Sequence, residues 1–244
     1  MRILLVGYGK MGRMIEGLAP EFGCEVAGKL DPHLPDGKDG PESDRWDSVD
    51  VAVDFSTPDS VVKNVPVLVG RGISVVIGTT GWQKDEAAVR RAVADTAAGV
   101  VAAANFSTGV VLFEAVVARA AALFSAHQEF GAWLNEAHHS TKKDAPSGTA
   151  LLLRRAMENA GFKRPIDVSS IRAGFIPGVH TVGFDGPADT ITLTHTARDR
   201  TAFARGALLA ANWIKGRRGW FTMHDVLGLE PGSWRETDEF KRRT

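Results

Sequence analysis

The sequence has little of several features that would mark a specialised class of protein. Its single cysteine, Cys24, excludes an internal disulfide and favours a reducing compartment. Lysine plus arginine equals aspartate plus glutamate at 29 each, so the net charge gives no case for nucleic acid or an anionic membrane. No apolar run approaches the roughly 20 residues of a membrane-spanning helix. We therefore expect a cytoplasmic protein that binds neither nucleic acid nor a membrane.

The length and composition are those of a soluble globular chain. The 244 residues suffice for one large domain or two small ones, each with a buried core. The N-terminus reaches a glycine-rich turn at Gly7, too early for the apolar segment of a signal peptide. The charged tail after Leu229 is expected to be partly disordered.

Apolar runs typical of buried parallel strands recur along the first 105 residues, and most are separated by helical patterns. The expected strands are 3–6, 25–30, 49–55, 73–77 and 99–104. The expected helices are 11–18, one that opens at Pro58, and 83–97, while 33–46 reads as a loop. This alternation predicts an α/β, Rossmann-like domain with helices on both faces of a parallel sheet.

The second half of the chain has a different pattern. We expect helices at 109–126, 147–160 and 203–214, and strands at 129–136, 168–173, 179–185 and 190–196. Three of these strands follow one another with no helix between them, which predicts an α+β domain with a mixed or mostly antiparallel sheet. Such a sheet, covered on one face, would leave the other face for a partner subunit.

The first strand leads into a G-x-G-x-x-G pattern. It comprises Gly7, Tyr8, Gly9, Lys10, Met11 and Gly12. The first glycine permits the tight turn, the second lets the backbone approach a pyrophosphate, and the third lets helix pack on strand. The following helix N-terminus offers free N–H groups to phosphates, and Asp31, at the end of the second strand, is placed for a ribose hydroxyl. A plain structural turn is the alternative, but this context favours a dinucleotide site.

The residues near Asp31 bear on which dinucleotide binds. A carboxylate there would repel a 2′-phosphate, and Pro32 and His33 follow it rather than an arginine. Lys10 could offset that repulsion. NADH is therefore slightly favoured, with NADPH tolerated.

Two further loops of small residues end strands of the predicted parallel sheet. They supply the candidate cofactor contacts Gly78, Thr79, Thr80, Ala103, Ala104, Asn105 and Phe106. Ligands of open parallel sheets lie beyond the carboxyl ends of the strands, and small residues there let a flat nicotinamide ring lie close to the backbone. Ordinary small-residue turns are the alternative.

Residues 136–149 read E-A-H-H-S-T-K-K-D-A-P-S-G-T and join a strand to a helix. Ser147 is expected to cap that helix, so Gly148 and Thr149 present backbone N–H groups to an anion. Lys142 and His139 can add donors to the same anion. A small substrate with two carboxylates would explain this surplus of donors.

His138 and Lys142 are the candidate acid/base groups of this segment, because histidine titrates near neutral pH and an ammonium can protonate a forming anion. Taken singly, His138 could be a structural residue, and Lys142 with Lys143 a solvated pair. We expect no metal, since neighbouring histidines cannot easily share one ion and no further cluster completes a shell. The coincidence of acid, cation and anion-binding turn favours a site.

The motifs together identify a known family. They are V-G-Y-G-K-M-G-R, D-F-S-T-P, I-G-T-T-G, A-A-N-F-S-T-G, E-A-H-H-S-T-K-K-D-A-P-S-G-T-A, I-R-A-G, T-H-T-A and D-V-L. In this order, from residue 2 to Leu227, the chain resembles 4-hydroxy-tetrahydrodipicolinate reductase, long called dihydrodipicolinate reductase, of lysine and diaminopimelate biosynthesis. Phe175, where a polar residue is common, and Lys143 depart from the pattern.

The resemblance implies a domain plan and a reaction. The dinucleotide-binding domain would span 1–107, completed by 217–244, and a substrate-binding and oligomerisation domain would span 108–216 and form a homotetramer through its sheet. NAD(P)H would reduce a cyclic imine dicarboxylate to tetrahydrodipicolinate. His138 would be the acid/base group and Lys142 the proton donor, while His139, Ser147, Gly148 and Thr149 would form the substrate-binding site.

Two other readings remain in view. An acylating semialdehyde dehydrogenase would need a catalytic cysteine, and Cys24 lies in the nucleotide domain near the second strand. A non-catalytic redox sensor would have no use for His138 and Lys142 together with the Ser147 turn.

Overall fold

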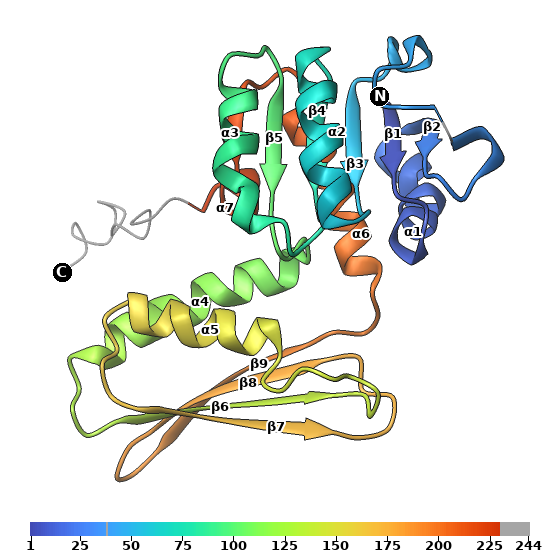
Figure 1. The fold of residues 1–244 in the computed structure, drawn as a ribbon. Helices are drawn as coiled ribbons and strands as arrows, with labels where there is room; N and C mark the ends of the chain where they lie inside the picture. The colour runs from blue at the N-terminus through green and yellow to red at the C-terminus, as the bar shows by residue number, and fades with distance from the viewer. Residues whose placement is uncertain (38, 230–244) are drawn as a thin grey trace. The chain divides into compact units, whose positions relative to one another are not determined.

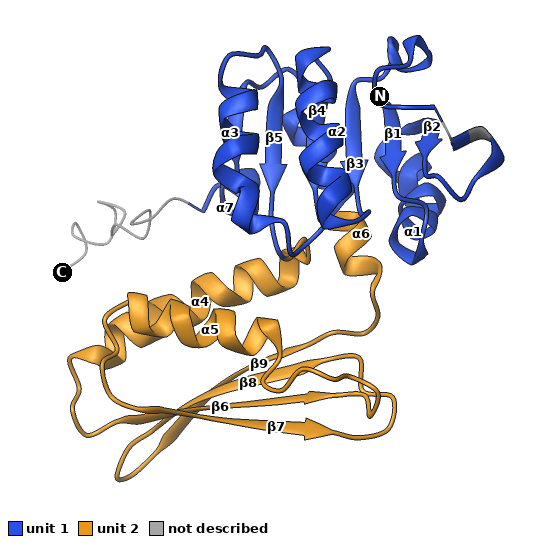
Figure 2. Cartoon of the chain, viewed as in Figure 1, with its two compact units in different colours: residues 1–104, 207–244 blue, residues 105–206 orange. Residues whose placement is uncertain are grey.

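The structure is a computed structural model that describes residues 1–37 and 39–229. It divides into unit 1, Met1–Ala104 with the segment from Ala207 onward, and unit 2, Asn105–Gly206 (Figure 2). The expected boundaries lie a few residues later at the first division and ten later at the second. The shift arises because α6 (Thr201–Ile214) enters unit 1 at Ala207, where Leu208, Ala211 and Ile214 are fully buried. The tail after Leu229, expected to complete the first domain and to be partly disordered, lies outside the described residues.

Unit 1 contains a six-stranded parallel sheet in the order β10-β5-β4-β3-β1-β2 (Figure 1). Its strands are β1 (Arg2–Val6), β2 (Glu25–Leu30), β3 (Val51–Asp54), β4 (Ser74–Ile77), β5 (Gly99–Ala102) and β10 (Gly219–Phe221). β3 and β4 are buried along their whole length, which explains why they read as unbroken apolar runs. The predicted Rossmann-like sheet is confirmed, with β10 as an unpredicted sixth strand.

Helices cover both faces of this sheet. They are α1 (Lys10–Leu18), α2 (Pro58–Gly70), α3 (Glu86–Ala94), the later part of α6, and the short α7 (Met223–Val226). α2 and α3 pack on one face through Val61 and Val89, and α6 lies behind the other (Figure 1). α2 starts as expected, with Thr57 as N-cap and Pro58 in its first turn.

Short 3₁₀ turns fill several connections of unit 1. They are Ala19–Phe22, Pro35–Gly37, Asp44–Trp46 and Gln83–Asp85. The last of these replaces the first turn of the helix expected at 83–97. Trp46, in the connection expected to be a plain loop, is almost fully buried against the sheet.

Unit 2 is a four-stranded mixed sheet in the order β7-β6-β8-β9, with helices α4 (Thr108–Ser125) and α5 (Gly148–Asn159). Its strands are β6 (Gly131–His138), β7 (Ile166–Arg172), β8 (Val179–Asp185) and β9 (Thr190–Thr196). β6 pairs parallel with β7 and antiparallel with β8, as predicted for a mixed sheet. Both helices lie over one face of the sheet (Figure 1), and their apolar residues form the core of the unit with Leu134 and Phe184.

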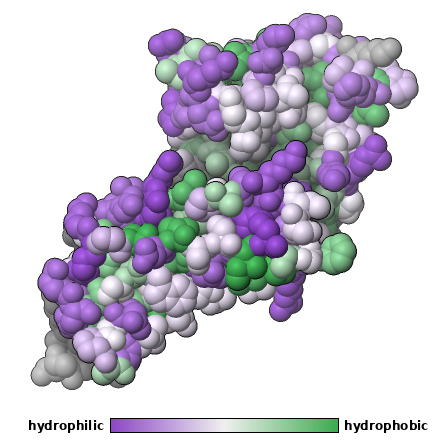
Figure 3. Space-filling view, turned by 60° about the horizontal axis from the view of Figure 1, so that its bottom comes forward, coloured by the Kyte–Doolittle hydropathy of each residue, from purple (hydrophilic) through white to green (hydrophobic). Residues whose placement is uncertain are grey.

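The other face of this sheet carries small polar side chains together with larger and charged ones such as Trp133 and Asp167. Asn135 donates a hydrogen bond to Ser169 across β6 and β7, and the hydroxyls of Thr181 and Thr194 bond across β8 and β9. Figure 3 turns this side of the molecule towards the viewer and shows apolar and weakly polar patches between hydrophilic ones. Ile171 on this face is about half exposed, at 48%.

α4 is apolar enough, by length and composition, to pass as a membrane span, contrary to the expectation that no segment approaches that length. It is the one such helix among the residues that the structure describes. It also carries Glu114 and Arg119 and buries Val117 and Ala121 in the core of unit 2. A core helix passes the same test, so this feature alone is weak evidence for a membrane.

Candidate active site

The glycine turn of unit 1 has the geometry of a dinucleotide cradle. A side chain at Gly7 (φ +85°) would place its Cβ 2.4 Å from the Phe55 carbonyl oxygen, and one at Gly12 would lie 2.4 Å from the Gly7 carbonyl oxygen. At Gly9 nothing lies within 4 Å of the corresponding position. Gly9 is also the N-cap of α1 and has no side-chain cap, so the first N–H groups of the helix are available to an anion. These features fit a bound pyrophosphate.

Asp31 follows β2 and is tied to the glycine turn. Its carboxylate accepts the backbone N–H of Tyr8 at 2.7 Å and that of His33 at 2.9 Å. Burial raises the pKa of Asp31, but these two hydrogen bonds outweigh burial and the net pKa is lowered. The carboxylate is therefore ionised and fixed beside the turn.

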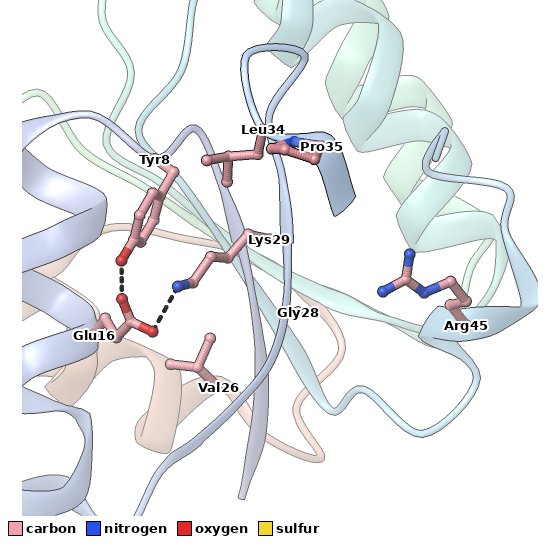
Figure 4. A pocket seen from close by; sticks show the side chains of 8 residues that line it. All are labelled: Tyr8, Glu16, Val26, Gly28, Lys29, Leu34, Pro35 and Arg45. Carbon is pink, nitrogen blue, oxygen red and sulfur yellow. Dashed lines mark hydrogen bonds and ion pairs between the residues drawn. The ribbon is translucent and has the colours of Figure 1, made fainter. Parts of the chain in front are cut away.

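A cavity of about 340 Å³ lies next to this turn (Figure 4). It is lined by Tyr8, Glu16, Val26, Gly28, Lys29, Leu34, Pro35 and Arg45. The Lys29 ammonium lies 2.7 Å from the Glu16 carboxylate, which also accepts the Tyr8 hydroxyl (Figure 4). Arg45 pairs with Asp39. Each cation on the wall of the cavity thus has a carboxylate partner.

The loops after β3 and β4 meet at the same edge of the sheet. Thr79 donates its hydroxyl hydrogen to Asp54 at 2.7 Å and accepts the backbone N–H of Ser56. A Cβ at Gly78 would strike the Phe55 ring at 2.2 Å, so glycine is required there. Burial raises the pKa of Asp54. Its second carboxylate oxygen has no hydrogen-bond partner within the described part of the chain.

The remaining predicted cofactor residues fall at or near the ends of the two units. Thr80 is exposed after β4, while Ala103 and Ala104 end the first part of unit 1. Asn105 and Phe106 begin unit 2, where the Asn105 side chain accepts the N–H of Ser107 at 2.8 Å. Phe106 is buried as a whole residue, with 1% of its surface exposed.

In unit 2, the inner face of the sheet changes from apolar to polar along β6. Alternate residues of this strand are buried, first Ala132 and Leu134, then Glu136 and His138. The register places His180 of β8 opposite Glu136, and His195 of β9 opposite His180. The helix-covered face therefore ends in a row of ionisable side chains.

Glu136 is fully buried at the centre of this row. Its carboxylate accepts two hydrogen bonds from the Arg172 guanidinium, at 2.9 and 2.7 Å, and the backbone N–H of Ser147 at 3.2 Å. Burial raises the pKa of Glu136, but hydrogen bonds from Arg172, Ser170 and His138 outweigh it and lower the pKa to about 2. Glu136 is thus ionised at neutral pH.

His138 lies beside this carboxylate, with its Nδ1 2.5 Å from Glu136 Oε2. Burial lowers the pKa of His138, the Lys142 and Arg172 charges reinforce that effect, and Glu136 opposes it. The net pKa is lowered, so the ring is neutral at pH 7. Because an ionised carboxylate can only accept, Nδ1 carries the proton and Nε2 has a free lone pair.

Gly178 keeps space in front of that Nε2 atom. A Cβ at Gly178 would lie 3.1 Å from His138 Nε2. We expect Gly178→Ala to lower turnover about ten-fold, since the methyl group crowds the ring and alanine is strained at the φ of +153° that Gly178 adopts. Steady-state kinetics check this, with Gly131→Ala at the other end of β6 as the control. Equal turnover in both variants would contradict the crowding argument.

The loop between β6 and α5 holds the other predicted residues. His139 Nδ1 lies 2.8 Å from the Thr141 hydroxyl, and Lys142 Nζ lies 2.8 Å from Asp144 Oδ1. Ser147 is buried and caps α5, accepting the N–H of Ala150, which confirms the predicted cap. The next two residues, Gly148 and Thr149, are exposed and half-buried. Phe175, after β7, is almost fully exposed at 96%.

His180 contacts the capping serine, with its Nε2 3.2 Å from Ser147 Oγ. Its Nδ1, like that of His195, lacks a hydrogen-bond partner among residues 1–37 and 39–229. Burial, followed by the neighbouring histidines, lowers the pKa of His180 to about 4. The ring is therefore neutral in the folded protein down to that pH.

This depressed pKa predicts a pH-dependent stability. Between about pH 6.5 and 4 the unfolded chain binds a proton at His180 that the folded chain does not. The free energy of unfolding should then fall by up to about 3 kcal/mol as pH drops through that window. Urea titrations at pH 7.5 and 5 should show a smaller drop in the free energy of unfolding for His180→Gln than for wild type. The surface variant His127→Gln, which keeps His180, should drop as much as wild type. Equal drops in wild type and His180→Gln would refute this.

Comparisons with known proteins bear on this site. A family model described as dihydrodipicolinate reductase, N-terminus, matches residues 1–106, and one described as dihydrodipicolinate reductase, C-terminus, matches residues 109–227. The chain belongs to the dihydrodipicolinate reductase family. The family, the fold class and the class of pyridine-nucleotide-dependent reductase predicted from sequence are thus confirmed.

Relatives and solved structures of this family agree. The chain is 35% identical over 239 residues to the 4-hydroxy-tetrahydrodipicolinate reductase of Christiangramia forsetii, covering 93% of this chain and 98% of the relative. It is 37% identical over 268 residues to that of Rhodopseudomonas palustris, covering 94% and 98%. The fold is similar to a dipicolinate-bound dihydrodipicolinate reductase from Paenisporosarcina sp. TG-14, with TM-score 0.77, 22% identity, and 91% and 97% of the two chains covered.

Sequence reasoning missed four residues of this family member's polar row: Glu136, Arg172, His180 and His195. The period-2 burial of β6 could have pointed to Glu136, since it shares a face with Leu134. The expected strand ended at 136, two residues before β6 ends, so His138 was assigned to a loop rather than to the strand. The other three depend on strand register, which the local sequence does not reveal.

Proposed function

We propose that this chain is a 4-hydroxy-tetrahydrodipicolinate reductase, which uses NADH or NADPH to reduce a cyclic imine dicarboxylate to tetrahydrodipicolinate in lysine and diaminopimelate biosynthesis. The observation that carries the proposal is the polar end of the unit 2 sheet. There an oriented imidazole, an ammonium and a capped helix N-terminus lie on one connected segment. The names of the relatives support the same reaction.

The substrate carboxylates would be held by the segment that opens α5. The N–H groups of Gly148 and Thr149 would bind an anion at the helix N-terminus, where the Gly148 N–H bonds the Asp144 carboxylate in the free protein. The buried Ser147 hydroxyl holds the cap in place. His139, half-buried on the same loop, adds a side-chain donor. The Paenisporosarcina neighbour binds dipicolinate, a planar dicarboxylate, which fits this choice of ligand.

His138 and Lys142 would handle the proton that accompanies reduction. The bound dinucleotide supplies the hydride, so this chain must supply one proton to the anion that results. The Lys142 ammonium, held by Asp144, can donate that proton and stabilise the anion. His138 is neutral with its lone pair on Nε2, so it can exchange a proton there as the acid/base group.

The glycine turn and the loops after β2, β4 and β5 would hold the dinucleotide. The proposed contacts are Gly7, Tyr8, Gly9, Lys10, Met11, Gly12, Asp31, Gly78, Thr79, Thr80, Ala103, Ala104, Asn105 and Phe106. The ionised Asp31 favours NADH, since a 2′-phosphate beside it would be repelled. Lys29 and Arg45 nearby already pair with carboxylates, while Lys10 is exposed and can still assist NADPH.

A coupled assay tests this function. The purified chain would be added to a dihydrodipicolinate synthase with its substrates, and the absorbance of NADH or NADPH followed. We expect consumption of both, with kcat/KM a few-fold higher for NADH, and none without the synthase. No consumption of either would refute the proposal. Reduction of NAD+ or NADP+ by an amino-acid semialdehyde with inorganic phosphate would instead favour an acylating semialdehyde dehydrogenase.

The chain would act in the cytoplasm as a homotetramer assembled through the outer face of the unit 2 sheet. That face carries hydroxyl side chains such as those of Thr181 and Thr194 beside the half-exposed Ile171, which suits packing of one sheet on another. Light scattering on purified protein measures the mass. A monomer at micromolar concentration would contradict the assembly.

A further inference from the structure

We propose that Glu136 is a positioning residue that sets the tautomer of His138. It also holds the loop that carries Lys142 and the N-terminus of α5 in place beside that ring. This inference rests on the proposed function, because it assigns Glu136 a part in the same reaction. The proposed role accounts for the unprotonated Nε2 of the buried His138 ring.

The first observation is that Glu136 and His138 form a buried carboxylate–imidazole pair on the inner face of the sheet. Both are inward-facing residues of β6, two positions apart, and they are 0% and 8% exposed. Nδ1 and Oε2 lie 2.5 Å apart. A carboxylate that accepts from one imidazole nitrogen leaves the lone pair on the other, which is the usual way proteins select a histidine tautomer.

The second observation is that the carboxylate is held rigidly and stays charged. Arg172, directly opposite His138 in the β6–β7 register, binds both carboxylate oxygens through its two terminal nitrogens. Such a two-point contact fixes the plane of the carboxylate as well as its position. The ring plane of His138 is fixed in turn, since its hydrogen bond must lie along a lone pair of that oxygen.

The third observation links Glu136 to the substrate-binding loop. Its Oε1 accepts the backbone N–H of Ser147, the N-cap of α5. Arg172, held by Glu136, also donates to the backbone carbonyl of Asp144 at 2.6 Å, and Asp144 pairs with Lys142. One carboxylate therefore orients the imidazole, the loop that carries the ammonium and the first turn of the anion-binding helix.

The tautomer can be measured without any substrate. In wild-type protein labelled with ¹⁵N at histidine, NMR at pH 7.5 should show His138 with a protonated Nδ1 and an unprotonated Nε2. In Glu136→Gln the side-chain amide can donate to Nδ1, so the ring should change to the Nε2–H form. A wild-type ring already in the Nε2–H form would overturn the proposal, whether or not the variant folds.

Kinetics supply the second test. Glu136→Gln should lower kcat by about 100-fold or more, since a wrong tautomer disables a catalytic histidine, and should also alter the pH profile of kcat. The control is Ser170→Ala, which removes another hydrogen bond to the same carboxylate yet leaves its charge and the His138 contact. It should keep the tautomer and stay within about two-fold of wild-type kcat.

The outcomes separate this inference from the function itself. A folded Glu136→Gln with wild-type kcat and pH profile would refute the positioning role while the reductase stands. A wild-type chain without reductase activity but with the Nδ1–H tautomer would refute the function and leave the orienting contact intact. Glu136→Asp, which keeps the charge at a shorter reach, should recover part of the activity lost in Glu136→Gln.

Discussion

Replacing Lys142 by methionine, or His138 by glutamine, should lower kcat by about 100- to 1000-fold while the affinity for NADH stays within two-fold of wild type. The size of the loss follows from the contribution of a positioned acid or base to a transition state. NADH affinity should be spared because both residues belong to unit 2, whereas the glycine turn belongs to unit 1. Coupled kinetics and fluorescence titration with NADH provide the two measurements.

The neighbour Lys143 offers a matched control for Lys142. It is exposed and has the same charge one position along the loop, so Lys143→Met should change kcat by less than about two-fold. If NADH affinity collapsed in Lys142→Met, the loop would belong to the nucleotide site, and the assignment of roles above would be wrong. Equal losses in the two lysine variants would point to the net charge of the loop instead.

The second large effect concerns the glycine turn. Gly12→Ala should weaken NADH binding by more than ten-fold and lower the Tm by several degrees. The added methyl would lie 2.4 Å from the Gly7 carbonyl oxygen, so α1 must move away from the turn that it closes. Strain of this kind costs about 1–3 kcal/mol. Calorimetry and NADH titration measure the two quantities.

Gly9→Ala provides the comparison within the same turn. No atom lies within 4 Å of its added methyl group, and Gly9 has φ −79°, so the Tm should not change. NADH should still bind more weakly, because the methyl occupies the side on which a pyrophosphate would approach the backbone. A Gly12→Ala variant with wild-type Tm and affinity would show that the turn is not closely packed.

Much of the fold follows from local patterns that the sequence displays openly. β8 and β9 have the predicted bounds, and the Ser147 cap of α5 lies where the turn residues indicate. β10 and α7 were missed because segments of three and four residues are too short to show a period. The strand expected at 129–136 lies at 131–138, because the chain continues as a strand through the inward-facing Glu136 and His138.

Part of the candidate site could likewise be predicted from local sequence, and part could not. The glycine turn and the loop up to Thr149 are contiguous in sequence, so their residue types and spacing suffice to predict them. The row from Glu136 to His195 is assembled by pairing between strands, and Arg172 joins it from β7. Such partners cannot be found from local spacing, because register is set by packing and turn geometry over the whole sheet.

The alternation of inward and outward residues along β6 has a consequence for misfolding of this chain. Leu134, Glu136 and His138 share one side of the strand, so sliding β6 by a single residue against β8 would turn all three outward at once. Molecules with this shifted register would lose the hydrophobic core of unit 2 and the proposed catalytic site together. Proteases that degrade unstable chains would therefore also remove inactive ones. Stability and activity depend on the same β6–β8 register, so selection for one preserves the other.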